Sequence, residues 1–359
     1  MTDPAPPDSA PDHVGGGPPV EPVPVVGIGA SAGGLEALRR FLDALPDNTG
    51  MAFVVITHLD PTRESMLPEI LQHHTRMPVR QVTEHLALAP NHVYVIPPAR
   101  RIVLSDSHLD IAAFDEPRGQ RRPIDLFFRS LAQARQDAIA IVLSGSGTDG
   151  AVGVKSIKEQ GGLLLVQQPE EAEYDGMPRA VIATGLADLV LPVQKLAGHI
   201  VQYRQAEPRL PGDPERLSAH DAQLLQRILT HVQLQTGHDF HQYKRSTVLR
   251  RLQRRMQLHG QRTLGAYLLF MHHTPHEAPA LFNDLLIGVT NFFRDVESWQ
   301  ALAEQVIPRL FEGRGPGDSV RAWTIGCATG EEAYTLAILL LEHTATLEEG
   351  TRPLDLQVF

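Results

Sequence analysis

Cysteine is nearly absent from this chain of 359 residues, since Cys327 is the only one. One cysteine cannot form a disulfide within the chain, and its isolation excludes a structural zinc site built from several cysteines. Long hydrophobic runs are missing as well: none approaches the roughly 18 apolar residues of a membrane-spanning helix. The N-terminus lacks a basic stretch followed by an apolar one, the pattern of a secretory signal. We therefore expect a cytoplasmic protein without membrane insertion and without a metal site.

Positive charge is also in short supply. The chain has 32 lysines and arginines against 42 aspartates and glutamates, which gives a formal net charge of −10. Proteins that bind nucleic acid usually have a surface rich in basic residues, so we expect no nucleic-acid partner. The remaining composition, 42% hydrophobic and 21% charged residues, is typical of a soluble globular protein. The length allows two or three domains, each with its own core.

The first half of the chain predicts an α/β domain. Residues 1–22 are rich in proline and glycine, and we expect a disordered leader because they cannot bury enough apolar surface to offset their ordering entropy. Over residues 23–200, short apolar runs alternate with amphipathic segments. This alternation predicts a doubly wound, mostly parallel sheet. The expected strands are 23–28, 51–57, 138–143 and 163–167, and the expected helices are 34–45, 63–74, 123–135 and 150–160.

The second half of the chain changes character after a proline-rich polar stretch. We expect residues 201–217 to be a linker and residues 218–286 to form an all-α domain, with Ser218 and Ser246 as N-caps of two helices. Residues 287–359 predict an incomplete Rossmann-like start: a strand at 320–325, a glycine turn, a helix at 333–342 and a strand that begins at 354.

A glycine-dense turn between the first strand and the first helix is the most informative motif. The letters GIGASA at 27–32 satisfy G-x-G-x-x-A, a dinucleotide-binding fingerprint. The overlapping letters GASAG at 29–33 satisfy G-x-S-x-G, in which Ser31 is presented as a nucleophile between a strand and a helix N-terminus. The two motifs predict different enzymes.

The residues after the next strands favour the nucleophile. A dinucleotide site needs an acidic residue at the end of the second strand, where this chain has His58 and only then Asp60. This weakens the dinucleotide interpretation without excluding it. A nucleophilic serine needs a base and an acid that orients the base, and His58 and Asp149 both follow strands of the same sheet. The competing interpretation is a helix-capping serine beside a turn-forming aspartate.

Six segments carry a family resemblance. GIGASAGGLEAL, THLDP, VYVIPP, RPIDLFFRSLA, LSGSGTDGAVG and EYDGMPRAVI together resemble the chemotaxis protein-glutamate methylesterases of the CheB type, over roughly residues 24–195. The resemblance implies that Ser31, His58 and Asp149 form a catalytic triad that needs no cofactor. It also implies hydrolysis of glutamyl methyl esters, and deamidation of glutamines, on methyl-accepting chemoreceptor-like proteins.

The chain departs from that family at three places. Ala32 follows the serine, where threonine is frequent, and Ser146 stands in the middle of the family's G-M-G segment. The backbone N–H of Ser146 is the expected oxyanion donor, and a backbone donor survives a change of side chain. Residues 1–22 cannot form the N-terminal phosphoacceptor domain that is usual in the family.

An arginine-rich helix follows in the second half. The residues Arg250, Arg251, Arg254 and Arg255 recur at helical spacing opposite an apolar face. Arginine forks bind carboxylates well, so an acidic receptor helix is the partner that these side chains would suit. The alternative is a solvated polar face.

The rest of the chain resembles the partner enzyme. YKRSTVLRRLQRRM, VTNFFRD and GCATGEE make residues 218–359 similar to the CheR-type glutamate O-methyltransferases. The resemblance implies that Thr290, Arg294 and Glu331 contact S-adenosylmethionine, whereas Gly288 replaces a frequent asparagine. The acid that holds the ribose follows the second strand in such folds, and the sequence stops inside that strand, so we expect no methyl transfer. The alternative functions are a methyltransferase completed by a missing C-terminal part and a non-catalytic scaffold that binds receptors.

Overall fold

The computed structural model describes residues 22–359 except 60–64, 118, 136, 207–215, 287–291, 316, 329 and 348–354. It divides into two compact units, Met1–Leu285 and Leu286–Phe359, and each is described by itself. The expected leader, apart from its last residue, lies outside the described residues, as do most of the expected linker and Thr290.

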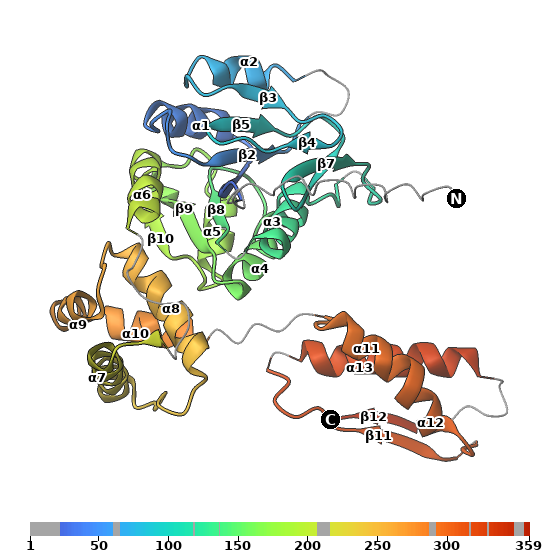
Figure 1. Ribbon diagram of the computed structural model, residues 1–359. Helices are drawn as coiled ribbons and strands as arrows, with labels where there is room; N and C mark the ends of the chain where they lie inside the picture. The colour runs from blue at the N-terminus through green and yellow to red at the C-terminus, as the bar shows by residue number, and fades with distance from the viewer. Residues whose placement is uncertain are drawn as a thin grey trace, which may run out of the picture. The chain divides into compact units, whose positions relative to one another are not determined.

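A seven-stranded sheet is the centre of the first unit (Figure 1), with the order β10-β9-β8-β1-β2-β5-β3. Each neighbouring pair runs parallel. The doubly wound, mostly parallel architecture predicted from the sequence is therefore confirmed. The strands are β1 Val25–Ala30, β2 Ala52–Thr57, β3 Val79–Gln81, β5 His92–Val95, β8 Ile139–Val142, β9 Leu163–Gln167 and β10 Leu189–Leu191.

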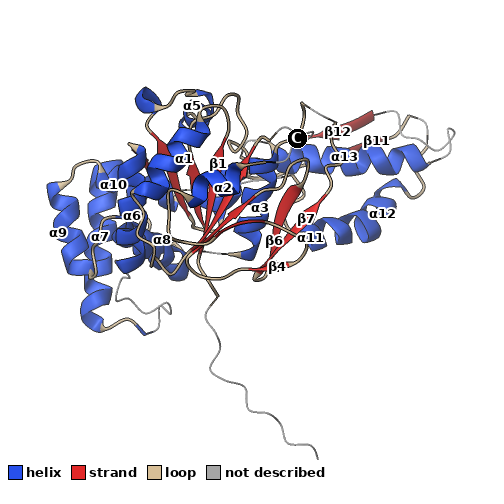
Figure 2. Cartoon of the chain, turned by 90° about the horizontal axis from the view of Figure 1, so that it is seen from above, coloured by secondary structure: helices blue, strands red, loops and turns tan. Residues whose placement is uncertain are grey.

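Helices cover both faces of this sheet. Successive strand residues point to opposite faces, so Val26 and Ile28 of β1 pack with the helices of one face while Val25 packs with those of the other. In Figure 2 the strands fan out between these two layers. The first layer contains α1 Gly34–Asp43, α2 Leu67–Gln72 and α6 Val193–Gln205, and the second contains α3 Pro123–Ala134, α4 Gly153–Glu159 and α5 Gly176–Ile182.

A small antiparallel sheet is built from β4 Leu86–Ala87, which lies between β3 and β5 in the chain, and from β6 Arg101–Ser105 and β7 His108–Ala112, which lie between β5 and α3. Its order is β4-β7-β6. Its buried residues Ile102 and Leu109 join the apolar core under α3. A 3-10 turn, η1 Pro169–Glu171, follows β9.

The helical part of the first unit has its own core, which includes Ile228, Leu252 and Tyr267. Its helices are α7 Ala219–Thr236, α8 Arg245–Leu258, α9 Leu264–His273 and α10 Glu277–Leu285. The predicted cap of α7 is confirmed, since Ser218 Oγ accepts a hydrogen bond from Asp221 N. The predicted cap at Ser246 is wrong: the N-cap lies two residues earlier, at Lys244, which makes no side-chain cap hydrogen bond, and Ser246 is inside α8.

The second unit holds a two-stranded parallel sheet of β11 Ser319–Ala322 and β12 Asp355–Val358. The strands are linked through α13 Glu331–Thr346, as the strand, helix and strand expected from the sequence require. α11 Val296–Ala301, the π-helical turn η3 Leu302–Val306 and α12 Ile307–Phe311 precede them. Across both units, none of the described helices is long and apolar enough to cross a membrane.

Candidate active site

Three adjacent strands at the middle of the sheet carry the site. β8, β1 and β2 are neighbours, and the ends of β1 and β2 are level because Ala30 pairs with Thr57. Ser31 directly follows β1, His58 directly follows β2, and Asp149 lies in the loop between β8 and α4. Ligand-binding crevices of open α/β sheets form at this carboxyl edge.

The three predicted residues form one hydrogen-bonded series. Ser31 Oγ lies 3.0 Å from His58 Nδ1, and His58 Nε2 lies 2.9 Å from Asp149 Oδ2. The side chain of His58 is 36% exposed and that of Asp149 only 7%. The series therefore leads from an accessible hydroxyl and imidazole to a buried carboxylate. This is the arrangement in which a histidine can take a proton from a serine while a carboxylate orients the ring.

The carboxylate of Asp149 is fixed by the start of α3. Its Oδ2 accepts a hydrogen bond from Ile124 N at 3.1 Å, and its Oδ1 accepts from Asp125 N at 3.0 Å and from Gly150 N at 2.9 Å. Free N–H groups at a helix N-terminus bind an anion well, and the helix dipole adds to this. These hydrogen bonds fix the orientation of the Asp149 carboxylate relative to the imidazole of His58.

Asp125 is a positioning residue that the sequence analysis missed. Its Oδ1 accepts hydrogen bonds from Val152 N at 3.0 Å and Gly153 N at 2.7 Å, which ties the start of α4 to α3. Burial raises the pKa of Asp125, the neighbouring Asp149 raises it further, and the bond from Gly153 acts in the opposite direction. The signal in the sequence is the acid two residues after the proline that opens this helix.

Ser144, which the sequence analysis also missed, stabilises the turn that contains Ser31 through hydrogen bonds. Its carbonyl accepts a hydrogen bond from Ser31 N at 3.0 Å, and its Oγ donates to Ala32 O at 3.0 Å and accepts from Tyr174 N at 3.0 Å. Gly33 is required in this turn because its φ is +67° and because a Cβ there would lie 2.8 Å from Ser144 Oγ. The first serine of SGSGTDG is the sequence signal for Ser144.

Two backbone groups suit the oxyanion of an ester intermediate. Among the described residues, neither Ser146 N–H nor Ala32 N–H has a hydrogen-bond partner, whereas Ser31 N–H is used by Ser144. In a G-x-S-x-G turn the N–H after the nucleophile is a usual donor. Ala32 thus joins the predicted Ser146, whose side chain is exposed, as a candidate.

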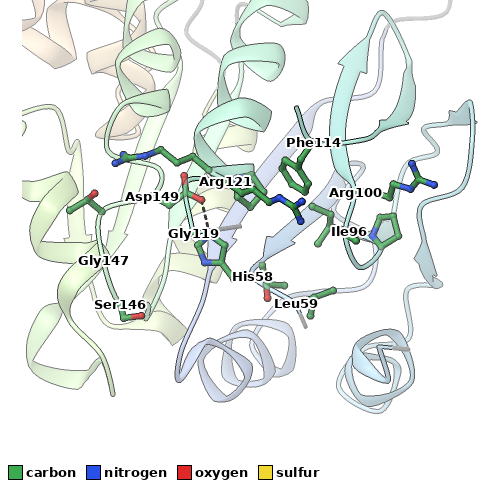
Figure 3. Close-up of a pocket in the computed structure, with 16 residues that line it drawn as sticks. His58, Leu59, Ile96, Arg100, Phe114, Gly119, Arg121, Ser146, Gly147 and Asp149 are labelled. Carbon is green, nitrogen blue, oxygen red and sulfur yellow. Dashed lines mark hydrogen bonds and ion pairs between the residues drawn. The ribbon is translucent and has the colours of Figure 1, made fainter. Parts of the chain in front are cut away.

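Two hollows border the series. The larger, about 490 Å³, is lined by His58, Asp149 and Ser146 on one side and by Phe114 and Arg121 on the other (Figure 3). The smaller, about 240 Å³, is lined by Ser31 together with apolar residues of α2. Both hollows are also lined by Thr57 and Leu59. A substrate can therefore reach the serine and the histidine from neighbouring sides.

The arginines of α8 are arranged differently from the predicted docking face. Arg251, Arg254 and Arg255 are 5%, 5% and 7% exposed, and Arg250 alone is exposed. The hydrogen-bond and ion-pair partners of these three buried arginines lie within the chain, on the α/β domain and on α10. Their side chains are therefore not accessible to a receptor. The sequence could not reveal this, because a helical repeat shows which residues share a face but not what covers that face.

The residues expected to contact S-adenosylmethionine are only partly described. Thr290 lies outside the described residues, Arg294 is exposed and Glu331 is the first residue of α13. Gly330 is the N-cap residue of that helix, with φ +100°, a left-handed conformation that favours glycine. For metals, no group of three or more suitable ligands exists among the described residues.

Comparison with known proteins gives three family matches along the chain. The CheB methylesterase model matches residues 26–200, the all-alpha domain of CheR methyltransferase matches 223–286, and the SAM binding domain of CheR matches 288–352. A putative protein-glutamate methylesterase/protein-glutamine glutaminase of Leptospira interrogans is 31% identical over 180 residues, 50% of this chain and 93% of that protein. The chain belongs to the CheB methylesterase family.

This member of the CheB family is also similar to a longer uncharacterized protein and to a solved structure. An uncharacterized 104.1 kDa protein of Rhodobacter capsulatus is 38% identical over 298 residues, which are 77% of this chain but only 31% of that protein. The chain thus spans less than a third of that relative. The crystal structure of the Thermotoga maritima CheB methylesterase catalytic domain is 27% identical, with a TM-score of 0.47, and the match covers 50% of this chain and 97% of that one.

Proposed function

We propose that the α/β domain over residues 23–200 is a serine hydrolase of the cytoplasm. It hydrolyses the methyl esters of glutamyl side chains on methyl-accepting chemoreceptor-like proteins, and it deamidates glutamines at such positions. The hydrogen-bonded series of Ser31, His58 and Asp149 is the observation that carries the proposal. Membership of the CheB family supports the choice of ester, since the Leptospira relative is named for both reactions.

The first half of the reaction forms an acyl-enzyme. Ser31 Oγ attacks the ester carbonyl carbon while its proton passes to His58 Nδ1, and the N–H groups of Ala32 and Ser146 stabilise the oxyanion. The C–O bond to the methoxy group then breaks, and His58 returns the proton to that oxygen, so methanol leaves. Asp149 keeps the imidazole in the required tautomer and stabilises its positive charge.

The second half restores the serine. A water molecule attacks the acyl carbon, His58 takes one of its protons and delivers it to the departing Ser31 Oγ, and a glutamate side chain is released. A glutamine amide follows the same course with ammonia as the leaving group. One site therefore serves both reactions.

Methanol release tests this proposal. The full chain is incubated with a helical peptide that carries a γ-methyl glutamate, and methanol is measured by gas chromatography. We expect release by the wild type and a loss of at least about 10³-fold in His58→Ala. His73→Ala, which replaces a histidine outside the triad, is the matched control and keeps the wild-type rate. Equal rates in His58→Ala and the wild type would contradict the proposal.

For residues 288–352 we propose binding of S-adenosylmethionine, supported by the match to the SAM binding domain of CheR. Arg294 and Glu331 are the described residues that would hold the methyl donor, together with Thr290. When bound, the donor supplies an activated methyl group. Isothermal titration of the full chain with S-adenosylmethionine tests this: we expect heat of binding that is reduced in Glu331→Ala, and no heat in the wild type would contradict it.

A further inference from the structure

Arginines line one side of the larger hollow beside His58. Arg100 comes from the loop after β5, and Arg121 and Arg122 come just before α3. Figure 3 shows Arg121 and Arg100 on the side of the hollow that faces away from Ser146. The chain as a whole has a net charge of −10, so this concentration of positive charge is local.

The carboxylates of Asp149 and Asp115 are already engaged, whereas Glu116, whose backbone oxygen contacts Arg121, has a buried Oε2 without a hydrogen-bond partner among the described residues. Asp149 is the one carboxylate among the described residues that line the hollow; it is 6% exposed and accepts three backbone hydrogen bonds besides its contact with His58. Asp115, in the loop before α3, pairs with Arg101 at 3.2 Å. Arg122 is 3.5 Å from Asp125, which offsets part of its charge. Of the three arginines that the structure describes along the hollow, Arg100 and Arg121 form no ion pair with a described carboxylate, whereas Arg122 does.

Arg121 is held ready for a ligand. Its Cζ lies 5.0 Å from the centroid of the Phe114 ring, and its Nε donates to Glu116 O at 3.1 Å. A guanidinium fixed on an aromatic ring loses less freedom when it binds a carboxylate through its two terminal nitrogens. Arg100 is exposed and forms no ion pair with the described residues. Together, the preorganised guanidinium of Arg121 and the positive charge of Arg100 can bind a carboxylate.

We propose that Arg100 and Arg121 form a carboxylate subsite, which binds an acidic side chain of the substrate protein next to the glutamyl ester. The inference rests on the proposed function and adds to it a preference for ester groups that have an acidic residue nearby. Residues three or four apart on a helix have Cβ atoms about 5–6 Å apart, so an acid one turn from the ester lies on the same face. With the ester at Ser31 and His58, that acid reaches the adjoining hollow. Esters in acidic surroundings are then better substrates than isolated ones.

Two peptides test the subsite. Both are helical and carry one γ-methyl glutamate, with glutamates three and four residues away in the acidic peptide and glutamines in the neutral one. For the wild type at low salt we expect kcat/KM to be about tenfold higher for the acidic peptide, a preference that added salt reduces. In Arg100→Ala/Arg121→Ala the preference falls to about twofold or less, mainly through KM. Arg129→Ala removes an exposed arginine of α3 outside the hollow and keeps the full preference.

Binding separates this inference from the proposed function. The same peptides, labelled with a fluorophore, are titrated into Ser31→Ala chains and followed by anisotropy, which requires no hydrolysis. Tighter binding of the acidic peptide that disappears with the two arginine substitutions supports the subsite. Equal affinity for both peptides, or a preference that survives the substitutions, overturns it. Failure of the wild type to hydrolyse either peptide counts against the proposed function and leaves the binding result to decide the subsite.

Discussion

Asp149 holds His58 through Nε2 of the imidazole, at 2.9 Å, and leaves Nδ1 at 3.0 Å from Ser31 Oγ. In the serine protease triad the acid binds Nδ1, and Nε2 faces the serine. The two ring nitrogens have exchanged roles here. A neutral His58 must therefore carry its proton on Nε2, where it donates to Asp149, so that Nδ1 can accept the serine proton.

The first prediction concerns Asp149→Asn. An asparagine presents an N–H₂ group where Asp149 accepts hydrogen bonds, so it favours the wrong tautomer of His58. We expect kcat for ester hydrolysis to fall by about 10³–10⁴-fold. The ¹⁵N NMR signals of His58 check the cause: the wild type should show the Nε2–H tautomer and the variant should not. An unchanged tautomer with a full loss of activity would contradict this explanation.

Ser144→Ala tests how Ser144 stabilises the turn that contains Ser31. The substitution removes the acceptor of Tyr174 N–H and the donor to Ala32 O. Both hydrogen bonds are partly buried, and the loss of such a bond costs about 0.5–1.5 kcal/mol, so the α/β domain should unfold at a lower temperature. Labelling of Ser31 by a fluorophosphonate should slow as well. Ser156→Ala, in α4 and away from the turn, is the control that should label at the wild-type rate.

A pair of neighbouring arginines tests the burial of α8. Arg254 contacts Asp188 and Asp284, and it also donates to Gly162 O at 3.2 Å. Arg254→Ala leaves these buried carboxylates with Lys158 as their described ion-pair partner, and removing one partner of a buried pair costs about 3–5 kcal/mol. Arg250→Ala, at an exposed position, should change stability by no more than about 0.5 kcal/mol. Similar unfolding temperatures for the two variants would show that α8 is not packed as described.

Glu277 predicts a loss of stability in acid. Burial would raise its pKa, but hydrogen bonds from His259 and Arg255 outweigh burial and lower the pKa from 4.5 to about 2. Because the folded pKa is the lower one, the stabilisation is complete above about pH 4.5 and disappears as the pH falls toward 2. It amounts to about 3 kcal/mol on the linkage relation.

Thermal denaturation followed by circular dichroism between pH 7 and pH 3 measures this effect. The transition of the helical part should move to lower temperature below pH 4.5. In Glu277→Gln it should start lower at pH 7, since Arg255 loses its partner, and change less between pH 5 and pH 3. A pH dependence as steep as that of the wild type would assign the effect to another group.

The sequence predicted the parts of the site that depend on strand ends. Apolar runs located β1, β2 and β8, and the residues that follow them had to meet at one edge of a parallel sheet. It missed Ser144 and Asp125 because their contacts join loops far apart in the chain, which no local pattern reveals. It also missed the burial of Arg254, because the cover comes from Asp188, 66 residues away.

The most direct test of the account is to trap the acyl-enzyme on the full chain. A slowly released γ-ester of a glutamyl peptide is mixed with the protein, quenched in acid, and the digest is examined by mass spectrometry. We predict that one acyl group is added to the peptide containing Ser31, and that Ser31→Ala acquires none and loses about 10⁴-fold or more in hydrolysis. An acyl group on another residue, or hydrolysis that persists in Ser31→Ala, would contradict the assignment of Ser31 as the nucleophile.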